Sequence, residues 1–246
     1  MFTSDLKLFN SKLDDAVYLC EKRHSPYFFS FLTEEEQAYA EQHLNSVHFT
    51  NYSFFGGSDT SERRVLGLFY DEQTDFPVDA ILFTFRKTDK LTHRDFLGSL
   101  MSLGIERETV GDILVGDGRA VVFVKSEIKE YIMSQISKVG KVGVTLSDAD
   151  GSALPQGRGV EEKEYTVSSM RLDNIVSAVS GLSREKAKNL ILSGSVSVNH
   201  LPCQKISRNT EQGDKLTIRG KGKFEISGVL GETKKHRIRI SIIHYR

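Results

Sequence analysis

The chain has 246 residues with 33 basic and 33 acidic side chains, so its formal net charge is zero. A hydrophobic content of 39%, with 27% charged residues and only 4 prolines, is typical of a globular protein of one or two domains. This composition excludes a collagen, a disulfide scaffold and an intrinsically disordered chain.

Residues 1–75 are predicted to form helices followed by strands. Apolar side chains recur every three or four positions from Thr3 to Lys22, which is typical of one buried helix face. A second helix is expected after Thr33, because Thr33 and Glu36 have the spacing of a capping box. Two extended segments are expected at 48–55 and 64–70, with a turn between them.

Residues 76–148 are predicted to form a βαββαβ domain. The pattern gives, in order, strand 79–86, helix 92–103, strand 112–115, strand 119–125, helix 126–137 and strand 141–147. This order is that of ferredoxin-like domains, which include RNA-recognition motifs. Phe83, Phe85 and Phe123 are candidates for stacking on bases. We favour core packing against the two helices for them, because the strand 119–125 lacks the glycine and most aromatics of an RNA-recognition motif.

The sign of the charge changes at a predicted linker, residues 149–164, which lies in a stretch rich in Gly, Ser and Asp. Residues 1–160 contain 17 Lys and Arg against 24 Asp and Glu, a net charge of −7. Residues 161–246 contain 16 against 9, a net charge of +7. The neutral total therefore conceals a basic C-terminal domain, residues 165–246, of the kind that binds phosphates.

The C-terminal domain is predicted to contain two helices and a hairpin. Apolar residues from Leu172 to Val179 share one helix face, and Gly181 ends that helix. Ser183 caps the second helix, in which Arg184 and Lys188 lie on one flank and Lys186 on the opposite side. A short strand, 196–198, then leads into a tight turn at 199–200.

Two short motifs invite a functional interpretation, and for both a structural one is favoured. Thr92 and Asp95 are expected to cap a helix, which leaves His93 and Arg94 as secondary phosphate contacts rather than catalytic groups. The stretch 219–223 lacks the spacing of a phosphate-binding loop, so we expect a turn between strands 215–219 and 223–227 whose lysines could contact an RNA backbone.

The sequence contains no recognisable catalytic or metal-binding motif, so we expect neither an enzyme nor a bound metal or cofactor. The two cysteines, Cys20 and Cys203, lack partners at zinc or redox spacing and are expected to be reduced thiols. The N-terminus contains charges before any apolar run, and no long uncharged stretch is apolar enough for a membrane span. We therefore expect a cytoplasmic protein.

The segment RLDN, followed by SREKAKNLILSGSVSVNHLPCQKIS and EQGDKLTIRGKGKF, resembles the S-four (S4) RNA-binding domain. One departure is His200, at a position where that family has Gly after Asn. Upstream, ERRVLGLFYD, FPVDAILFTF and LTHRDFLGSLMSLGIERETVGDILV resemble the YlmH family of bacterial proteins. This resemblance implies a ferredoxin-like RNA-binding domain followed by an S4 domain, and a role in large-subunit quality control of peptidyl-tRNA.

The sequence therefore predicts an α+β protein that binds structured RNA, either ribosomal or transfer RNA, without catalysis, DNA specificity or membrane binding. Two alternatives remain open, namely an RNA-modifying enzyme targeted by its S4 domain and an interaction adaptor linked to cell division. The residues predicted to bind RNA are Arg171, Asp173, Ser183, Arg184, Lys186, Lys188, Asn199, His200, Lys205, Arg208, Lys221 and Lys223, with His93 and Arg94 as secondary contacts.

Overall fold

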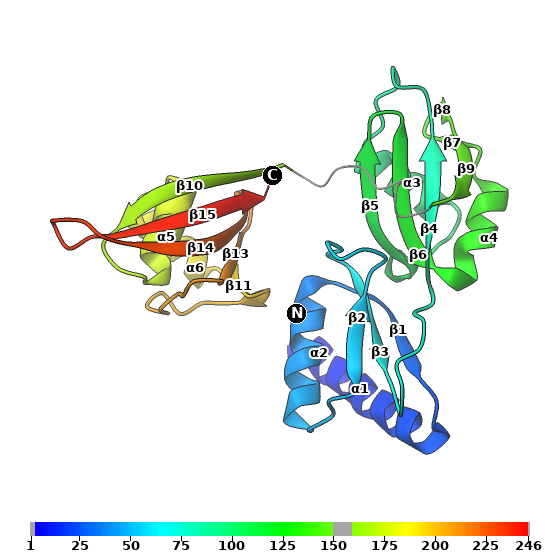
Figure 1. Ribbon diagram of the computed structural model, residues 1–246, viewed down its shortest axis with the longest axis horizontal. Coiled ribbons are helices and arrows are strands. Elements are labelled where there is room, and N and C mark those ends of the chain that lie inside the picture. Colours follow the sequence, from blue (N-terminus) through cyan, green and yellow to red (C-terminus); the bar gives the residue numbers. More distant parts are fainter. Residues whose placement is uncertain (1–2, 150–158, 246) are drawn as a thin grey trace. The chain divides into compact units, whose positions relative to one another are not determined.

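The computed structural model describes residues 3–149 and 159–245. The chain divides into two compact units, Met1–Gly157 and Arg158–Arg246, and each is described by itself (Figure 1). Most of the predicted linker lies outside the described residues. No helix in the described ranges is long and apolar enough to cross a membrane.

The first unit begins with two helices packed on a small antiparallel sheet of strand order β1-β3-β2. Its elements are α1 (Thr3–Arg23), β1 (Tyr27–Leu32), α2 (Glu34–Ser46), β2 (Tyr52–Phe55) and β3 (Arg64–Leu68). Both predicted helices are confirmed, and so is the capping box. The Glu36 backbone N–H donates to Thr33 Oγ1 (3.3 Å), and the Thr33 N–H donates to Glu36 Oε2 (2.8 Å). The strand β1 was not predicted.

The rest of the first unit is the ferredoxin-like domain. Its elements are β4 (Val78–Thr84), α3 (His93–Ser102), the 3-10 helix η1 (Arg107–Thr109), β5 (Val110–Gly116), β6 (Arg119–Lys125), α4 (Ser126–Gln135), β7 (Lys138–Val139), β8 (Val142–Gly143) and β9 (Thr145–Asp148). The main sheet is antiparallel with order β5-β6-β4-β9, which confirms the βαββαβ prediction. The last predicted strand, 141–147, is divided between β8 and β9.

Both faces of this four-stranded sheet are covered. Phe83 and Phe85 face the helices, where the Phe83 ring meets Phe96 edge-on at 5.4 Å between centroids. Phe123 lies on the opposite face and packs with Phe31 of β1 and Val65 of β3. The expected packing against the two helices is confirmed for Phe83 and Phe85. For Phe123 it is wrong, because this side chain is buried on the other face of the sheet. The face that an RNA-recognition motif offers to bases is therefore occupied here by the N-terminal strands.

Polar contacts fasten the N-terminal strands to the ferredoxin-like domain. The Asp112 carboxylate on β5 accepts hydrogen bonds from the backbone N–H groups of Glu62 (2.6 Å) and Arg63 (3.2 Å). The Arg63 guanidinium donates to the carbonyl of Phe31 (2.8 Å), and Lys125 Nζ donates to that of Phe29 (3.1 Å). Burial lowers the pKa of both Arg63 and Lys125, as expected for cations inside a packed junction.

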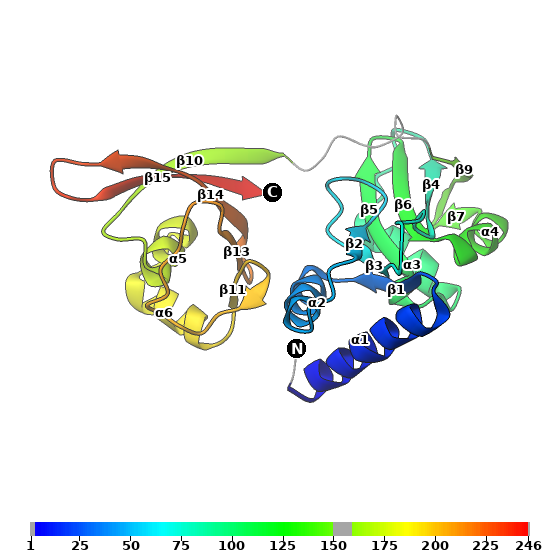
Figure 2. The same cartoon turned by 60° about the horizontal axis from the view of Figure 1, so that its bottom comes forward.

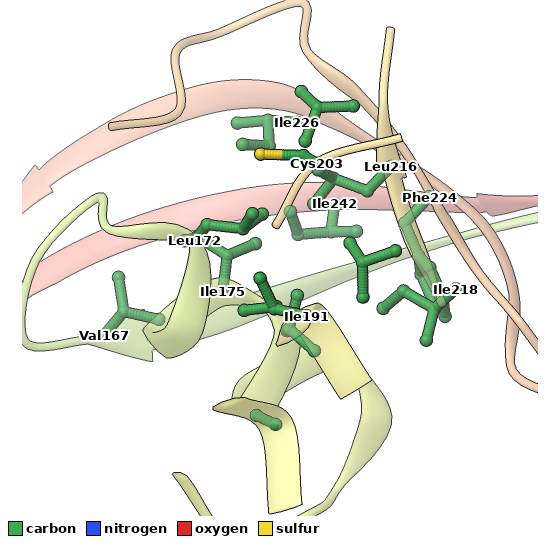
Figure 3. Close-up of a cluster of buried hydrophobic side chains, with 14 of the residues drawn as sticks. Val167, Leu172, Ile175, Ile191, Cys203, Leu216, Ile218, Phe224, Ile226 and Ile242 are labelled. Atoms are coloured by element: carbon green, nitrogen blue, oxygen red, sulfur yellow. The ribbon is translucent and has the colours of Figure 1, made fainter. Parts of the chain in front are cut away.

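The second unit is a six-stranded antiparallel sheet with two helices on one face (Figures 1 and 2). Its elements are β10 (Val160–Val167), α5 (Leu172–Ser180), α6 (Arg184–Leu192), β11 (Val196–Val198), β12 (Leu201–Pro202), β13 (Lys215–Ile218), β14 (Gly222–Glu232) and β15 (Ile238–Tyr245), and the strand order is β10-β15-β14-β13-β11-β12. Figure 3 shows the core, in which Ile175 and Ile191 from the helices meet Leu216 and Ile218 from the sheet.

The strand β10 overlaps the predicted linker, because it begins at Val160 and pairs with β15 along its whole length. Its sequence, VEEKEYTV, carries three glutamates, and only Val167 is fully buried. An edge strand of this kind is stabilised by backbone pairing rather than by an apolar face, so periodicity does not reveal it.

The predicted turn between β13 and β14 is confirmed, while β15 and the full length of β14 were not predicted.

Candidate nucleic-acid interface

The two helices of the second unit are fixed by local signals at each end. Arg171 is the N-cap residue of α5, and Gly181 ends that helix in the left-handed conformation with φ of 68°. Ser183 caps α6 by accepting a hydrogen bond from the backbone N–H of Lys186 (3.4 Å). The tight connection between the helices brings Arg184, in the first turn of α6, to the first turn of α5.

A buried carboxylate joins two arginines at this point. Asp173 is fully buried; its Oδ1 accepts from Arg171 Nε (3.0 Å) and its Oδ2 from Arg184 Nη2 (2.9 Å). The two arginine side chains remain 40% and 56% exposed. Burial by itself would raise the pKa of Asp173, but the hydrogen bonds and charges of Arg184 and Arg171 outweigh it, so this pKa lies below its usual value.

This arrangement changes the role of Asp173 from the one predicted. A fully buried carboxylate does not reach RNA, and its charge would repel phosphate. Instead it fixes one edge of each guanidinium. An arginine has five N–H donors in a planar fork, so each arginine keeps donors on its exposed edge that can bind a phosphate oxygen. Asp173 is thus placed to position the two arginines rather than to contact RNA itself.

A loop after β12 brings two more cations to the same place. The Leu172 N–H donates to the carbonyl of Arg208 (2.8 Å), and the Arg208 N–H donates to that of Lys205 (3.1 Å). Lys205 is exposed and Arg208 is half-buried. We call Arg171, Arg184, Lys205 and Arg208 the helix-end cluster. Lys188 is exposed one turn after Arg184 on α6 and extends the cluster along that helix.

The other cations of α6 and its capping residue lie differently. Lys186 is exposed, but it is two positions from Arg184, and residues two apart do not share a helix face. The hydroxyl of Ser183 is engaged in the helix cap. Neither residue adds to the helix-end cluster directly, although Ser183 fixes the first turn from which Arg184 extends.

Asn199 and His200 form the turn between β11 and β12, with φ of 51° and 69°. The Asn199 side chain donates to Asp214 Oδ1 (2.7 Å), and its oxygen accepts the backbone N–H of Lys215 (2.9 Å). The amide of Asn199 is thus used in fastening the turn to β13. His200 stands where the S4 family has Gly. As expected, it adopts the positive φ that this turn requires.

Lys221 and Lys223 lie at a different end of the unit. The turn between β13 and β14 is held by the Arg219 N–H, which donates to the carbonyl of Ser195 (2.9 Å), just beyond the C-terminal end of α6. Arg184 is at the start of α6, and the turn contacts the chain just beyond the end of that helix. The 9 residues of α6 place these two points roughly 13 Å apart along the helix axis. The structure therefore brings the helix-end cluster together and places these two lysines apart from it.

His93 and Arg94 begin α3 of the first unit, where the expected cap is present. Both the N–H and the hydroxyl of Thr92 donate to Asp95 Oδ2 (2.8 and 2.7 Å). The contact of His93 and Arg94 with phosphate stays a prediction.

Within residues 3–149 and 159–245, no group of three or more His, Cys, Asp or Glu is placed to hold a metal ion. Cys20 and Cys203 are both buried free thiols.

The sequence also contains a basic run near its C-terminus, for which no role was predicted. Residues 234–237 read Lys-Lys-His-Arg, and Arg239 follows. The structure places this run at the tip of the hairpin formed by β14 and β15.

Comparison with known proteins places both units among described domains. Residues 72–152 match the family described as "Putative RNA-binding domain in YlmH", and residues 170–216 match the S4 domain. The chain is 34% identical over 197 residues to the "Ribosome-associated protein quality control protein P2" of Bacillus subtilis (strain 168), which covers 77% of this chain and 76% of the relative. A solved structure, "Cell division protein ylmH from Streptococcus pneumoniae", shares the fold over 62% of this chain and 95% of its own, with a TM-score of 0.53 and 22% identity.

Proposed function

The chain belongs to the YlmH-like family and contains both its RNA-binding domain and an S4 domain. From this premise we propose that it is a non-catalytic, cytoplasmic RNA-binding protein that associates with the ribosome. Its ligand is structured RNA, ribosomal or transfer RNA. We infer that it acts in quality control of peptidyl-tRNA on the large subunit; the name of the Bacillus subtilis relative supports the coarser role, ribosome-associated protein quality control.

The observation that carries the proposal is the helix-end cluster. Asp173 holds the guanidinium groups of Arg171 and Arg184 at 3.0 and 2.9 Å, and the backbone of the 205–208 loop is hydrogen-bonded to the start of α5. Arginines that are fixed before binding lose less conformational entropy when they take up phosphates. Two arginines held by one buried acid, with Lys205 and Arg208 on a loop bonded to the same helix end, suit a phosphate backbone of defined shape.

Structured RNA is favoured over single strands because two phenylalanines of the sheets, which would be candidates for base stacking, are buried. Phe123 is buried under the N-terminal strands, and Phe224 is buried in the core of the second unit, stacked on His244 at 4.4 Å between centroids. Recognition of single-stranded RNA depends largely on stacking. Recognition of a folded RNA depends more on shape and phosphate contacts, which the helix-end cluster supplies.

The test removes two charges from the exposed edge of the proposed site. We expect Arg184→Ala with Lys188→Ala to weaken binding to purified large ribosomal subunits, and to make the dependence of log K on log salt concentration shallower by about 1 to 2. The matched control is Lys7→Ala with Lys12→Ala, two exposed residues of α1. Equal binding by the two double variants across a salt titration would contradict the site assignment.

The alternative functions have separate readouts. An RNA-modifying enzyme would leave a modification missing from ribosomal or transfer RNA of a deletion strain, which mass spectrometry detects. A protein adaptor would retain its pulled-down partners after nuclease treatment. We expect all modifications to be retained and the co-purifying ribosomal material to be lost on nuclease treatment.

A further inference from the structure

The hairpin of β14 and β15 lies outside the S4 family match, which ends at residue 216. β14 contains 11 residues, but only its first four pair with β13 on one side. Beyond them, the strand continues to Glu232 paired with β15 alone, and β15 pairs with β10 on its other edge. Figures 1 and 2 show the hairpin, in orange and red, projecting beyond the rest of the second unit.

The tip of the hairpin is an ordered turn. The His236 N–H donates to the carbonyl of Thr233 (2.9 Å), and the Thr233 N–H donates to that of Arg237 (2.8 Å). Thr233 Oγ1 accepts the Arg237 N–H (3.1 Å), and His236 takes the left-handed conformation with φ of 54°. These bonds leave Lys234 and Lys235 at the two central positions of the turn.

The tip carries a concentrated positive charge. Residues 232–239 contain four Lys and Arg against one Glu, a net charge of +3. Lys234, Lys235 and Arg237 are exposed. Arg237 donates to the carbonyl of Thr166 (2.7 Å), and Arg239 pairs with Glu164 (3.1 Å), so both are held against β10. In the described part of the chain, Lys234 and Lys235 form no ion pair with an acid, and their charges are available to a partner.

The tip and the helix-end cluster lie at the same end of the unit. Ile238, the first residue of β15, pairs with Val167, the last residue of β10. Only four residues lead from Val167 to Arg171, so their Cα atoms are at most about 14 Å apart. Lys223, in contrast, pairs with Tyr245 at the opposite end of the same hairpin, and it precedes Glu232 by nine residues, or roughly 30 Å along β14.

We propose that the hairpin tip is a second RNA-contact surface, through which Lys234 and Lys235 bind phosphates of the same folded RNA that occupies the helix-end cluster. This inference rests on the proposed function. Lysine offers a mobile point charge without base-reading geometry, so the contact is to the RNA backbone and independent of sequence. The two surfaces at one end of the unit would then favour an RNA whose folded shape brings phosphates to both of them. Lys221 and Lys223 would lie away from this RNA.

The experiment compares salt titrations of full-length variants on purified large ribosomal subunits and on a short stem–loop RNA. Lys234→Gln with Lys235→Gln removes the two charges but retains polar side chains of similar length. We expect binding to the subunits to weaken roughly fivefold near physiological salt. We also expect the slope of log K against log salt concentration to become shallower by about 1 to 2. The control, Lys7→Gln with Lys12→Gln, has the same net charge and should bind like the unaltered protein.

The outcomes separate this inference from the proposed function. If the unaltered protein binds neither probe, the proposed function fails. If it binds but the hairpin variant matches the control, only the inference is overturned. A hairpin variant that binds RNA normally but loses a protein partner retained after nuclease treatment also overturns it, in favour of an acidic protein surface. Unchanged melting temperatures of both variants verify that the fold is intact.

Discussion

At the scale of single residues, the helix-end cluster proposed to bind RNA depends on one acid that is itself buried. Asp173 is enclosed, while its two arginine partners are partly exposed. A buried carboxylate is tolerated only when its lone pairs are satisfied, and here both oxygens accept from guanidinium groups. The function of the acid is therefore expressed through the geometry of Arg171 and Arg184.

Replacement of Asp173 by Asn tests this role against simple electrostatics. The variant gains positive net charge, so attraction alone would strengthen RNA binding. We expect the reverse, a roughly tenfold weaker affinity, because the arginines lose their fixed orientation. Glu185→Gln changes the net charge equally at an exposed position of α6, and its affinity should be unchanged or slightly higher. Filter-binding assays of the two variants decide between the explanations.

The same residue predicts a pH dependence of stability. The pKa of Asp173 lies below its usual value in the folded protein, so its ion pairs stabilise the fold above pH of about 4 and are lost as pH falls through the lowered pKa. We expect Asp173→Asn to cost about 1–3 kcal/mol of unfolding free energy near neutral pH. Denaturant titrations should find that this difference shrinks on acidification; a difference independent of pH would contradict the ion-pair explanation.

At the scale of elements, the N-terminal strands decide what the ferredoxin-like sheet can do. The sheet has the order found in RNA-recognition motifs, yet Phe31 and Val65 cover its outer face around Phe123. Gly57 lies directly on that phenylalanine, because a Cβ at Gly57 would stand only 2.1 Å from the ring. A shared topology therefore does not bring the shared binding face with it.

The hydrogen bonds of Asp112 hold this cover in place, and their removal should loosen it. Asp112→Ala leaves the backbone N–H groups of Glu62 and Arg63 without their acceptor, which should cost about 1–3 kcal/mol. Asp117→Ala, at an 87% exposed position, should stay within about 0.5 kcal/mol of the unaltered protein. Thermal unfolding of the two variants makes the comparison. Equal melting temperatures would mean that the junction does not depend on this carboxylate.

At the scale of the whole molecule, neutrality is the sum of an acidic and a basic part. The charge of −7 over residues 1–160 should repel the phosphates of unrelated RNA, while the charge of +7 over residues 161–246 should attract phosphates. We expect a fragment of residues 158–246, which form a compact unit, to bind RNA less selectively than the full chain. Competition between ribosomal RNA and unrelated RNA measures this; equal selectivity would contradict the role of the acidic part.

The sequence alone predicted what depends on neighbouring residues. Periodic apolar faces, caps and turns located α1, α2, α3, α5 and α6 and the βαββαβ order, because these signals act within a few positions of the chain. The basic character of the C-terminal part was likewise predicted, because it follows directly from the number of charged residues. The edge strand β10 was missed, since it lacks an apolar face, and β15 was missed as well.

Only the tertiary structure decided which charges act together. Arg171, Asp173 and Arg184 are 13 residues apart at most, but that Asp173 is buried between two arginines follows from how α5 and α6 pack. Strand register likewise decides that Lys221 lies apart from Arg184. It also decides that the hairpin tip lies near Arg171. Long-range pairing sets these relations, and no local pattern in the chain encodes them.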